Sequence, residues 1–377
     1  MKKIFVVDPS LFSLPYDKKL VEELSKVESL DVTLFGRMLR ENESNNFSFK
    51  FIPYFYNFTS KLGLKNKYLK AFEHCMNMLF FLFYVIRKRP DAVHFQWLAI
   101  PFVDSIFIKA IKLFSSSKVI FTAHNSTAFH GESTSPLQSL YWEKSHLVFD
   151  RIQVHNHETA IKLINNGIAI QDKFFIAPHG PLSSINNINQ EEVDTPVKVY
   201  DFIMFGNLKG YKGVSFYLEA LSELYEKGFK FKALMVGRQY LSEADLNLSS
   251  ELEALGLLDT KFGYLKDEEL ESFVRFTKFS VFPYKEIDGS GALALAVSLG
   301  SVPIITKLPG LLEPTDNGKN ALLIAELTND SLTQTLIEAL SVSSLRLHET
   351  TERGKLFFIN HYSWENAALI LTEEYSK

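Results

Sequence analysis

The stretch from Val281 to Thr306 (VFPYKEIDGSGALALAVSLGSVPIIT) contains residues suited to binding an anion. Ser290 precedes an almost wholly apolar run, Ala292 to Leu299, which predicts a buried helix with Ser290 as its N-cap. Gly289 and Gly291 let a ligand approach the backbone closely. The free N–H groups and the positive dipole end of such a helix start favour a phosphate. A capped core helix whose glycines only serve a tight turn is the alternative, because short Gly-rich motifs are common.

Composition limits the class of protein. With 377 residues, 46% of them hydrophobic, the chain is long enough for two domains with separate cores. Its net charge of −4 gives no overall basic field, so we expect no nucleic acid as a partner. A single cysteine excludes an intrachain disulfide and is typical of a reducing cytosol. The first apolar run ends at Asp8, too early for a signal peptide, and the most apolar helix candidate, Met76 to Ile86, is shorter than the roughly 20 residues that span a bilayer.

Strand-like apolar runs alternate with helical segments along the chain, which predicts an α/β fold with parallel sheets covered by helices on both faces. The predicted strands are 4–7, 32–35, 49–54, 92–96, 119–124, 152–155, 174–177, 200–205, 231–236, 262–264, 279–283 and 302–306. Helices are predicted to begin near residues 17, 66, 101, 136, 158, 214, 251, 267 and 292. The polar stretch Ser183 to Pro196 is the predicted linker. We therefore expect two Rossmann-like domains that face a central cleft.

Ligands of open parallel sheets bind beyond the carboxyl ends of the strands, and the residues there are unusually polar. In the first half they are Asp8, Gln96, His124, Asn125, His155, Asn156, His179 and Gly180. In the second half they are Gly206, Asn207, Lys209, Lys212, Gly237, Arg238, the loop from Glu286 to Gly291, and Lys307. Neither half contains the G-x-G-x-x-G fingerprint, which argues against a nicotinamide or flavin cofactor. His155 and His157 alternate on a predicted strand end, but no third ligand stands at metal spacing, so no metal is expected.

Three segments together resemble the retaining glycosyltransferases of family 4 (group 1), which have the GT-B fold. They are FGNLKGYKGVSFYLEAL, PYKEIDGSGALALAVSLGSVPIIT followed by PGLLE, and FTAHNSTAFH. The C-terminal HYSWENAALILTEEY is similar to the family's last helix, which crosses back to the first domain. The resemblance covers nearly the whole chain. It implies an acceptor-side domain over residues 1–185, a nucleotide-sugar-binding domain over 197–360 and a crossing helix over 361–377.

The resemblance implies metal-independent transfer of a hexosyl-type sugar, with retention, from a nucleotide-diphosphate donor to an acceptor hydroxyl, without a further cofactor. The implied catalytic residues are His124, near the sugar, Lys212, on the donor diphosphate, and Glu286 or Asp288, on the sugar. The implied donor-binding residues are Gly206, Asn207, Lys209, Lys212, Gly237, Arg238, Tyr264, Leu265, Ser290, Gly291, Ala292 and Glu313.

Two positions depart from the family pattern. The family's second basic residue falls at Asn207, so Lys209 or Arg238 is the candidate for that charge. The second of two glutamates, which contacts the ribose in the family, falls on Leu295.

Each of these residues also has a structural interpretation. Lys212 is either the ligand of the diphosphate or a solvated lysine at a helix start. His124 is either a ligand of the sugar or a histidine at a strand end whose hydrogen bonds are satisfied within the protein. Glu313, expected at a helix start after PGLL, is a ribose contact or a carboxylate that stabilises the helix dipole. Tyr16, at the start of the first helix, is expected to face the cleft and to help bind the acceptor.

The segment from Phe47 to Arg89 interleaves aromatic residues with basic ones. The basic residues are Lys50, Lys61, Lys65, Lys67, Lys70, Arg87, Lys88 and Arg89. This composition favours an anionic membrane surface or a lipid-linked acceptor, and an ordinary core helix with solvated lysines is the alternative.

These observations predict a cytoplasmic, peripheral membrane glycosyltransferase, on the inner face of the membrane, that extends a glycan or glycolipid acceptor in cell-surface polysaccharide biosynthesis. Two alternatives remain. One is a nucleotide-sugar epimerase on the same fold, and the other is a catalytically inactive partner subunit that binds glycan or lipid.

Overall fold

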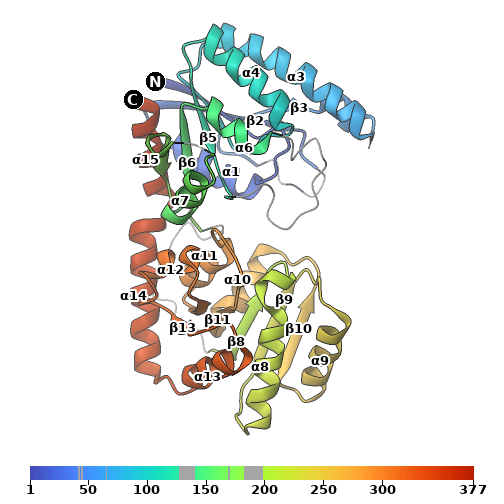
Figure 1. Cartoon of the computed structure of the whole chain (residues 1–377), viewed down its shortest axis with the longest axis vertical. Coiled ribbons are helices and arrows are strands. Elements are labelled where there is room, and N and C mark those ends of the chain that lie inside the picture. Colours follow the sequence, from blue (N-terminus) through green and yellow to red (C-terminus); the bar gives the residue numbers. More distant parts are fainter. Residues whose placement is uncertain (41–42, 44–45, 65, 127–140, 169, 182–197) are drawn as a thin grey trace. The chain divides into compact units, whose positions relative to one another are not determined.

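The computed structural model describes residues 1–40, 43, 46–64, 66–126, 141–168, 170–181 and 198–377. These residues divide into two compact units, one formed by residues 1–179 with 364–377 and the other by 180–363 (Figure 1). Each unit contains a parallel sheet with helices packed against it, so the predicted α/β class is confirmed. The predicted linker, Ser183 to Pro196, and the helix start predicted at Pro136 lie outside the described residues.

The first unit has a seven-stranded parallel sheet within its described residues, in the order β3-β2-β1-β4-β5-β6-β7. The strands are β1 (Lys2–Val7), β2 (Leu30–Arg37), β3 (Lys50–Phe55), β4 (Ala92–Phe95), β5 (Lys118–Thr122), β6 (Arg151–Val154) and β7 (Phe174–Ile176). The helices are α1 (Leu14–Ser25), α2 (Asn57–Lys61), α3 (Lys67–Lys88), α4 (Pro101–Phe114), α6 (Trp142–Ser145), α7 (His157–Asn165) and α15 (Trp364–Ser376). The strand order reverses between β1 and β4, which is where open parallel sheets bind ligands.

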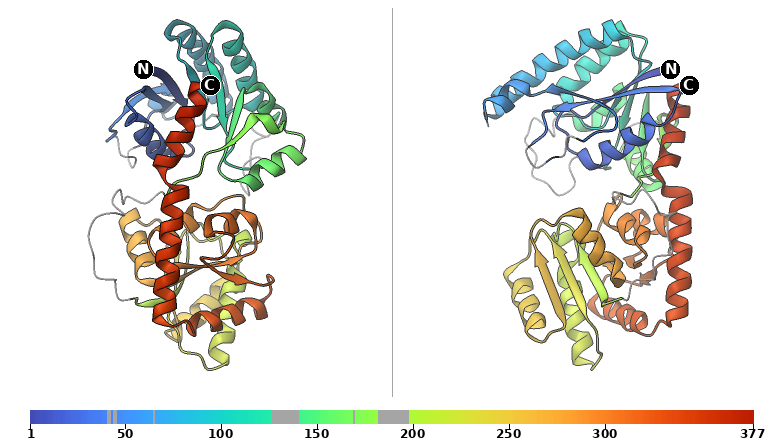
Figure 2. Two further views of the ribbon diagram at one scale, coloured as in Figure 1. Left: turned by 90° about the vertical axis from the view of Figure 1, so that its left-hand side faces the viewer. Right: turned by 180° about the vertical axis from the view of Figure 1, so that it is seen from behind.

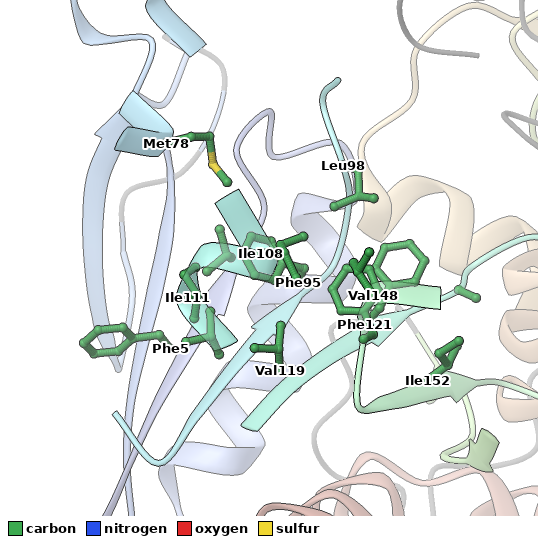
Figure 3. Close-up of a cluster of buried hydrophobic side chains, with 14 of the residues drawn as sticks. Phe5, Met78, Phe95, Leu98, Ile108, Ile111, Val119, Phe121, Val148 and Ile152 are labelled. Carbon is green, nitrogen blue, oxygen red and sulfur yellow. The ribbon is translucent and has the colours of Figure 1, made fainter. Parts of the chain in front are cut away.

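One face of this sheet carries an apolar core under α3 and α4. Figure 3 shows Phe5, Phe95, Val119 and Phe121 from the strands packed together with Ile108 of α4. Because both faces of the sheet are covered, all residues of β4 are buried, as expected for a central parallel strand.

The other face carries α1 and α15, and polar side chains lie between them and the sheet. The chain ends lie close together in this unit (Figure 2), where Lys2 Nζ donates to the carbonyl of Tyr375 at 3.0 Å. Lys118 Nζ donates to the carbonyl of Glu374 at 2.7 Å, and Arg151 donates to the Glu374 carboxylate at 3.2 Å. The last helix of the chain therefore belongs to the first unit.

The second unit has a six-stranded parallel sheet in its described residues, in the order β10-β9-β8-β11-β12-β13. The strands are β8 (Tyr200–Phe205), β9 (Ala233–Gly237), β10 (Leu258–Phe262), β11 (Thr277–Phe282), β12 (Val302–Thr306) and β13 (Leu322–Ile324). The helices are α8 (Val214–Glu226), α9 (Glu243–Ala254), α10 (Asp267–Arg275), α11 (Gly291–Ser298), α12 (Pro309–Leu312), α13 (Asn329–Leu340) and α14 (Ser344–Tyr362). Here the strand order reverses between β8 and β11.

Several predicted boundaries were wrong. The helix predicted from Glu251 begins at Glu243, because Ser242 caps it and accepts a hydrogen bond from the Asp245 N–H at 3.1 Å. The strand predicted over 262–264 is β10, and it ends before Gly263, whose φ of +122° breaks the extended backbone. The first helix begins at Leu14 rather than near residue 17.

Helix α3 begins at Lys67, next to the predicted start, and extends well beyond its most apolar stretch, Met76 to Ile86. It has 22 residues and a mean hydropathy of 1.3, so by length and composition alone it is able to cross a membrane. Its buried residues include Glu73 and His74, which are bonded to other parts of the first unit. The Glu73 carboxylate accepts from the Phe58 N–H at 2.7 Å, and His74 Nε2 lies 2.5 Å from Asp104 Oδ1. These polar contacts join α3 to α2 and α4 within the first unit.

Two buried carboxyl groups, Asp8 and Asp17, lie side by side at the carboxyl end of β1. Asp8 accepts hydrogen bonds from the N–H groups of Ser10 and Ser13, each at 3.2 Å, while the Ser13 hydroxyl donates to Asp17 at 3.3 Å. Burial raises the pKa of both carboxyls, and the neighbouring Asp8 charge raises the pKa of Asp17 further. Since Asp17 Oδ2 has no other donor among the described residues, we infer that the two carboxyls share a proton.

This pair predicts a specific pH dependence. Above the ordinary Asp pKa of 3.8 the unfolded chain releases a proton that folded Asp17 still holds, so stability falls as pH rises towards the raised folded-state pKa. Asp17→Asn keeps a hydrogen-bond donor and removes this titration. Its melting temperature should therefore equal or exceed that of the wild type at pH 7 and vary less between pH 5 and pH 8. A large loss of stability with an unchanged pH slope would contradict a shared proton.

Candidate functional site

In the second unit, the loops that follow β8 and β11 lie at the point where the strand order reverses. Gly206 directly follows β8 and has a φ of +98°, and the residues from Pro283 to Ser290 follow β11. The backbone N–H of Lys285 donates to the carbonyl of Tyr211 at 2.8 Å, which ties the two loops together. These are the loops in which the sequence predicted a phosphate site.

The start of α11 presents free backbone donors. Ser290 is the N-cap, as predicted, and its hydroxyl accepts a hydrogen bond from the Leu293 N–H at 3.1 Å. The N–H groups of Gly291 and Ala292 have no acceptor among the described residues. The rest of the helix, Leu293 to Ser298, is buried in the core of the second unit. The helix start is thus the part of α11 that is open to a ligand.

Lys212 is a buried cation without a carboxylate partner. It is only 7% exposed, which corrects the alternative of a solvated lysine, and it ends the 3₁₀ turn Gly210–Lys212 rather than opening a helix. Its Nζ lies 3.4 Å from the Phe205 carbonyl and 5.2 Å from the centre of the Tyr284 ring. No carboxylate in the described part of the chain forms an ion pair with it. Burial lowers the pKa of Lys212 below its ordinary value of 10.5.

Tyr284 links Lys212 to the start of α11. The ammonium lies over the Tyr284 ring, and the buried Tyr284 hydroxyl lies beside Ser290. Gly213, with a φ of +73°, allows the close approach on which this depends, since an added Cβ would lie 2.0 Å from the Pro283 carbonyl oxygen. The structure therefore brings Lys212 and Ser290 to the same loop cluster.

A second close contact brings Arg238 towards these loops. At Gly237, with a φ of +122°, an added Cβ would lie 2.1 Å from the Gly206 carbonyl oxygen. The Leu208 N–H donates to the Arg238 carbonyl at 2.8 Å. Lys209 Nζ lies over the Tyr240 ring at 5.4 Å, while Asn207 and Arg238 are exposed. Lys209 and Arg238 are thus the cations that follow β8 and β9, in place of a basic residue at Asn207.

The remaining predicted residues are spread over neighbouring loops. Glu286 is exposed, whereas Asp288 is 2% exposed, and its carbonyl packs against Gly310 of α12. Glu313 is the C-cap of α12 and also the first residue of the 3₁₀ helix Glu313–Thr315, so it lies at a helix start as expected. Tyr264 is 88% exposed, and Leu265 packs on the apolar core.

In the first unit, three histidines gather beyond the carboxyl ends of the strands. His155 Nε2 lies 3.2 Å from His124 Nδ1, and the rings of His155 and His179 meet edge to face with centroids 5.4 Å apart. Burial lowers the pKa of His155 to about 3, and it lowers the pKa of His124 well below 6.5, with His155 adding to the effect. His157, expected beside His155 on a strand, instead begins α7. Among the described residues no group of three potential ligands has the arrangement of a metal site.

Aromatic rings surround the histidines. The Trp97 ring stacks on His124 with 4° between the planes and 5.0 Å between the centroids. Tyr16 is 2% exposed and contacts all three imidazole rings, so it is part of the packed cluster and not an open surface residue. Its hydroxyl accepts a hydrogen bond from Gln153 Nε2 at 3.0 Å. Sequence reasoning missed Trp97 and Gln153, although Trp97 directly follows Gln96 at a strand end.

Residues 200–341 match the family model described as "Glycosyl transferases group 1". The matched residues lie within the second unit. A relative in Methanocaldococcus jannaschii, an uncharacterised glycosyltransferase, is 28% identical over 180 residues, which make up 47% of this chain and 48% of the relative. That match therefore spans about half the length of each protein. It agrees with the resemblance inferred from the sequence motifs.

Solved structures share the fold of the whole chain. A glycosyltransferase from Rickettsia africae covers 100% of this chain and 98% of its own, with a TM-score of 0.74 and 17% identity. HepE from Anabaena, solved with UDP and glucose, covers 100% of both chains, with a TM-score of 0.74 and 12% identity. The lipopolysaccharide outer core galactosyltransferase WaaB covers 100% of this chain and 99% of its own, with a TM-score of 0.66 and 15% identity. These similarities confirm the predicted GT-B fold.

Proposed function

We propose that the protein transfers a sugar from a nucleotide-diphosphate donor to a hydroxyl acceptor. The observation that carries this proposal is the buried Lys212 ammonium, which has no carboxylate partner in the described part of the chain and lies in the same loop cluster as the open start of α11. A buried charge without a counterion is costly, so an anionic ligand is the natural complement of this site. A nucleotide diphosphate is such a ligand, and the match of residues 200–341 to the group 1 glycosyltransferase model supports it.

In the proposed reaction, the acceptor oxygen bonds to the anomeric carbon while the bond from that carbon to the diphosphate breaks. The acceptor proton passes to the departing diphosphate, and attack on the front face retains the configuration. Lys212 and the N–H groups of Gly291 and Ala292 stabilise the negative charge that grows on the leaving oxygen. They supply the positive charge without a metal ion, and no side chain acts as a nucleophile.

The donor and the acceptor are proposed by chemical class. HepE has been solved with UDP and glucose, which supports a uridine diphosphate hexose as the first donor to test. Leu295 is only 9% exposed, lies in the apolar core and offers no polar group to the ribose. We therefore expect other groups to bind the ribose. WaaB acts on lipopolysaccharide, which supports a glycan or lipid-linked acceptor in cell-surface polysaccharide biosynthesis. An epimerase would need no acceptor, and an inactive partner subunit would release no sugar.

The donor site predicts a specific pattern of kinetic defects. Lys212→Ala should lower kcat about a hundredfold, as removal of one preorganised oxyanion donor does, while the donor KM rises less. Gly291→Val adds a side chain at the helix start and should abolish thermal stabilisation by nucleotide diphosphates. The measurements are nucleotide release with a panel of donors and thermal shift with UDP, GDP and ADP.

Lys227→Ala is the matched control, because Lys227 is an exposed lysine of the same unit paired with Glu223. It should keep wild-type turnover. If Lys212→Ala and Gly291→Val fold normally and also keep wild-type donor affinity and turnover, the diphosphate site is wrong. Product formed from the donor without any acceptor would favour the epimerase.

We further propose that α3 attaches the protein to the inner, anionic face of a cytoplasmic membrane. Its side chains Tyr68, Phe72, Phe80 and Phe83 are each at least half exposed. Basic residues flank them, namely Lys61, Lys67, Lys70, Arg87, Lys88 and Arg89, all of them exposed. Lys65 lies outside the described residues. Exposed aromatic side chains with a basic border suit the headgroup region of an anionic bilayer.

This attachment predicts salt-sensitive binding to vesicles. The protein should float with phosphatidylglycerol-containing liposomes and be released at high salt, because salt screens exposed charges. Replacing Lys61, Lys67 and Lys70 with Gln should weaken flotation several-fold. The control replaces Lys227, Lys230 and Lys261, exposed lysines of the second unit, and should float like the wild type. Equal binding to neutral and anionic vesicles would contradict the electrostatic part of the proposal.

A further inference from the structure

Two of the three histidines, His155 and His124, form a directional chain of hydrogen bonds in the first unit. His155 Nδ1 lies 3.2 Å from the carbonyl oxygen of Ala177, and His155 Nε2 lies 3.2 Å from His124 Nδ1. His124 Nε2 is out of contact with solvent and has no partner among the described residues. The chain therefore begins at a backbone carbonyl and ends at an unsatisfied ring nitrogen.

The carbonyl at one end decides where each proton lies. A backbone carbonyl only accepts, so His155 Nδ1 must carry a proton. Burial lowers the pKa of His155 to about 3, so the ring is neutral near pH 7 and its Nε2 is a bare acceptor. His124 Nδ1 must then be the donor. The pKa of His124 is also lowered well below 6.5, first by burial, so this ring is neutral too and its Nε2 carries a lone pair and no proton.

We propose that His155 is a positioning residue that holds His124 in its Nδ1–H tautomer, so that the free Nε2 accepts a hydrogen bond from a hydroxyl of the sugar substrate. The proposal rests on the proposed glycosyl transfer for the nature of the ligand, but the tautomer itself does not depend on it. An imidazole fixed in this way discriminates between ligands. Its lone pair attracts a hydroxyl proton and repels the lone pairs of a carboxylate or phosphate.

The packing around His124 supports a fixed orientation. Trp97 lies flat against the ring, and the edge of Tyr16 meets it at 86° with centroids 4.8 Å apart. The ring therefore has neighbours on a face and at an edge that restrict its rotation. Burying an acceptor without a partner destabilises the folded protein. A substrate hydroxyl bonded to Nε2 removes this penalty, which is a reason for the protein to keep the nitrogen unsatisfied.

The tautomer is directly measurable in the full chain. Long-range 1H–15N NMR on protein labelled at histidine distinguishes a protonated ring nitrogen from a bare one. In the wild type at pH 7 we expect His124 to be protonated at Nδ1 and bare at Nε2. His155→Leu removes the acceptor and keeps bulk, so a fraction of His124 should appear as the Nε2–H tautomer. His155→Gln places an amide oxygen where Nε2 was and should restore the wild-type pattern.

Kinetics provide the second readout. His155→Leu should lower kcat/KM at least tenfold for the donor that supports turnover in the panel, while His155→Gln should stay within about threefold of the wild type. His157→Gln, a change at the exposed neighbouring histidine, is the control and should have no effect. The melting temperatures of all variants should be close to that of the wild type. A variant with a much lower melting temperature would have a folding defect, and its kinetics would not report on positioning.

The outcomes separate this proposal from the proposed function. A wild-type His124 protonated at Nε2 overturns the tautomer assignment, whatever the activity. Unchanged kcat/KM in His155→Leu, or equal losses in the Leu and Gln variants, overturns the positioning role. If no donor supports turnover but the tautomer follows the predicted pattern, the proposed reaction fails while the assignment of His155 stands.

Discussion

The arrangement of the second unit depends on one uncompensated charge. The Lys212 ammonium is buried against the Phe205 carbonyl and the Tyr284 ring, contacts that together offset only part of the cost of removing it from water. Position 213 requires a glycine, because a Cβ there would clash with the Pro283 carbonyl oxygen. These local features position a cation at the reversal point of the sheet and leave its charge available to a ligand.

The first unit buries several neutral polar side chains that are hydrogen-bonded to one another. A continuous set of hydrogen bonds runs from Tyr16 through Gln153 and Thr122 to His94, and from His94 to Tyr375. It connects α1, the central strands and α15, so docking of the last helix is coupled to the position of the Tyr16 ring. Because Tyr16 contacts His124 and His155, this buried network also supports the histidine chain.

Local sequence signals identified most elements of the fold. Strands β8 and β12 have the predicted bounds, and Asn66 and Ser290 cap helices at the predicted places, because strand periodicity and N-caps are short-range properties. The start of α9 was missed because its capping box precedes a segment with little apolar periodicity.

The candidate site was less accessible to sequence reasoning. Lys212 was placed at the right loop, but its burial depends on Tyr284 and Pro283, more than seventy positions away. The contact between His124 and His155 likewise requires β5 and β6 to pair in register. Residue types after strands indicate where chemistry is possible, and only the tertiary structure shows which of these side chains meet.

The most direct test of the account is a crystal structure of the protein with UDP. The account predicts a diphosphate that contacts both Lys212 Nζ and the N–H groups of Gly291 and Ala292 at hydrogen-bonding distance. A diphosphate bound away from Lys212, with the ammonium still buried and unpaired, would contradict it.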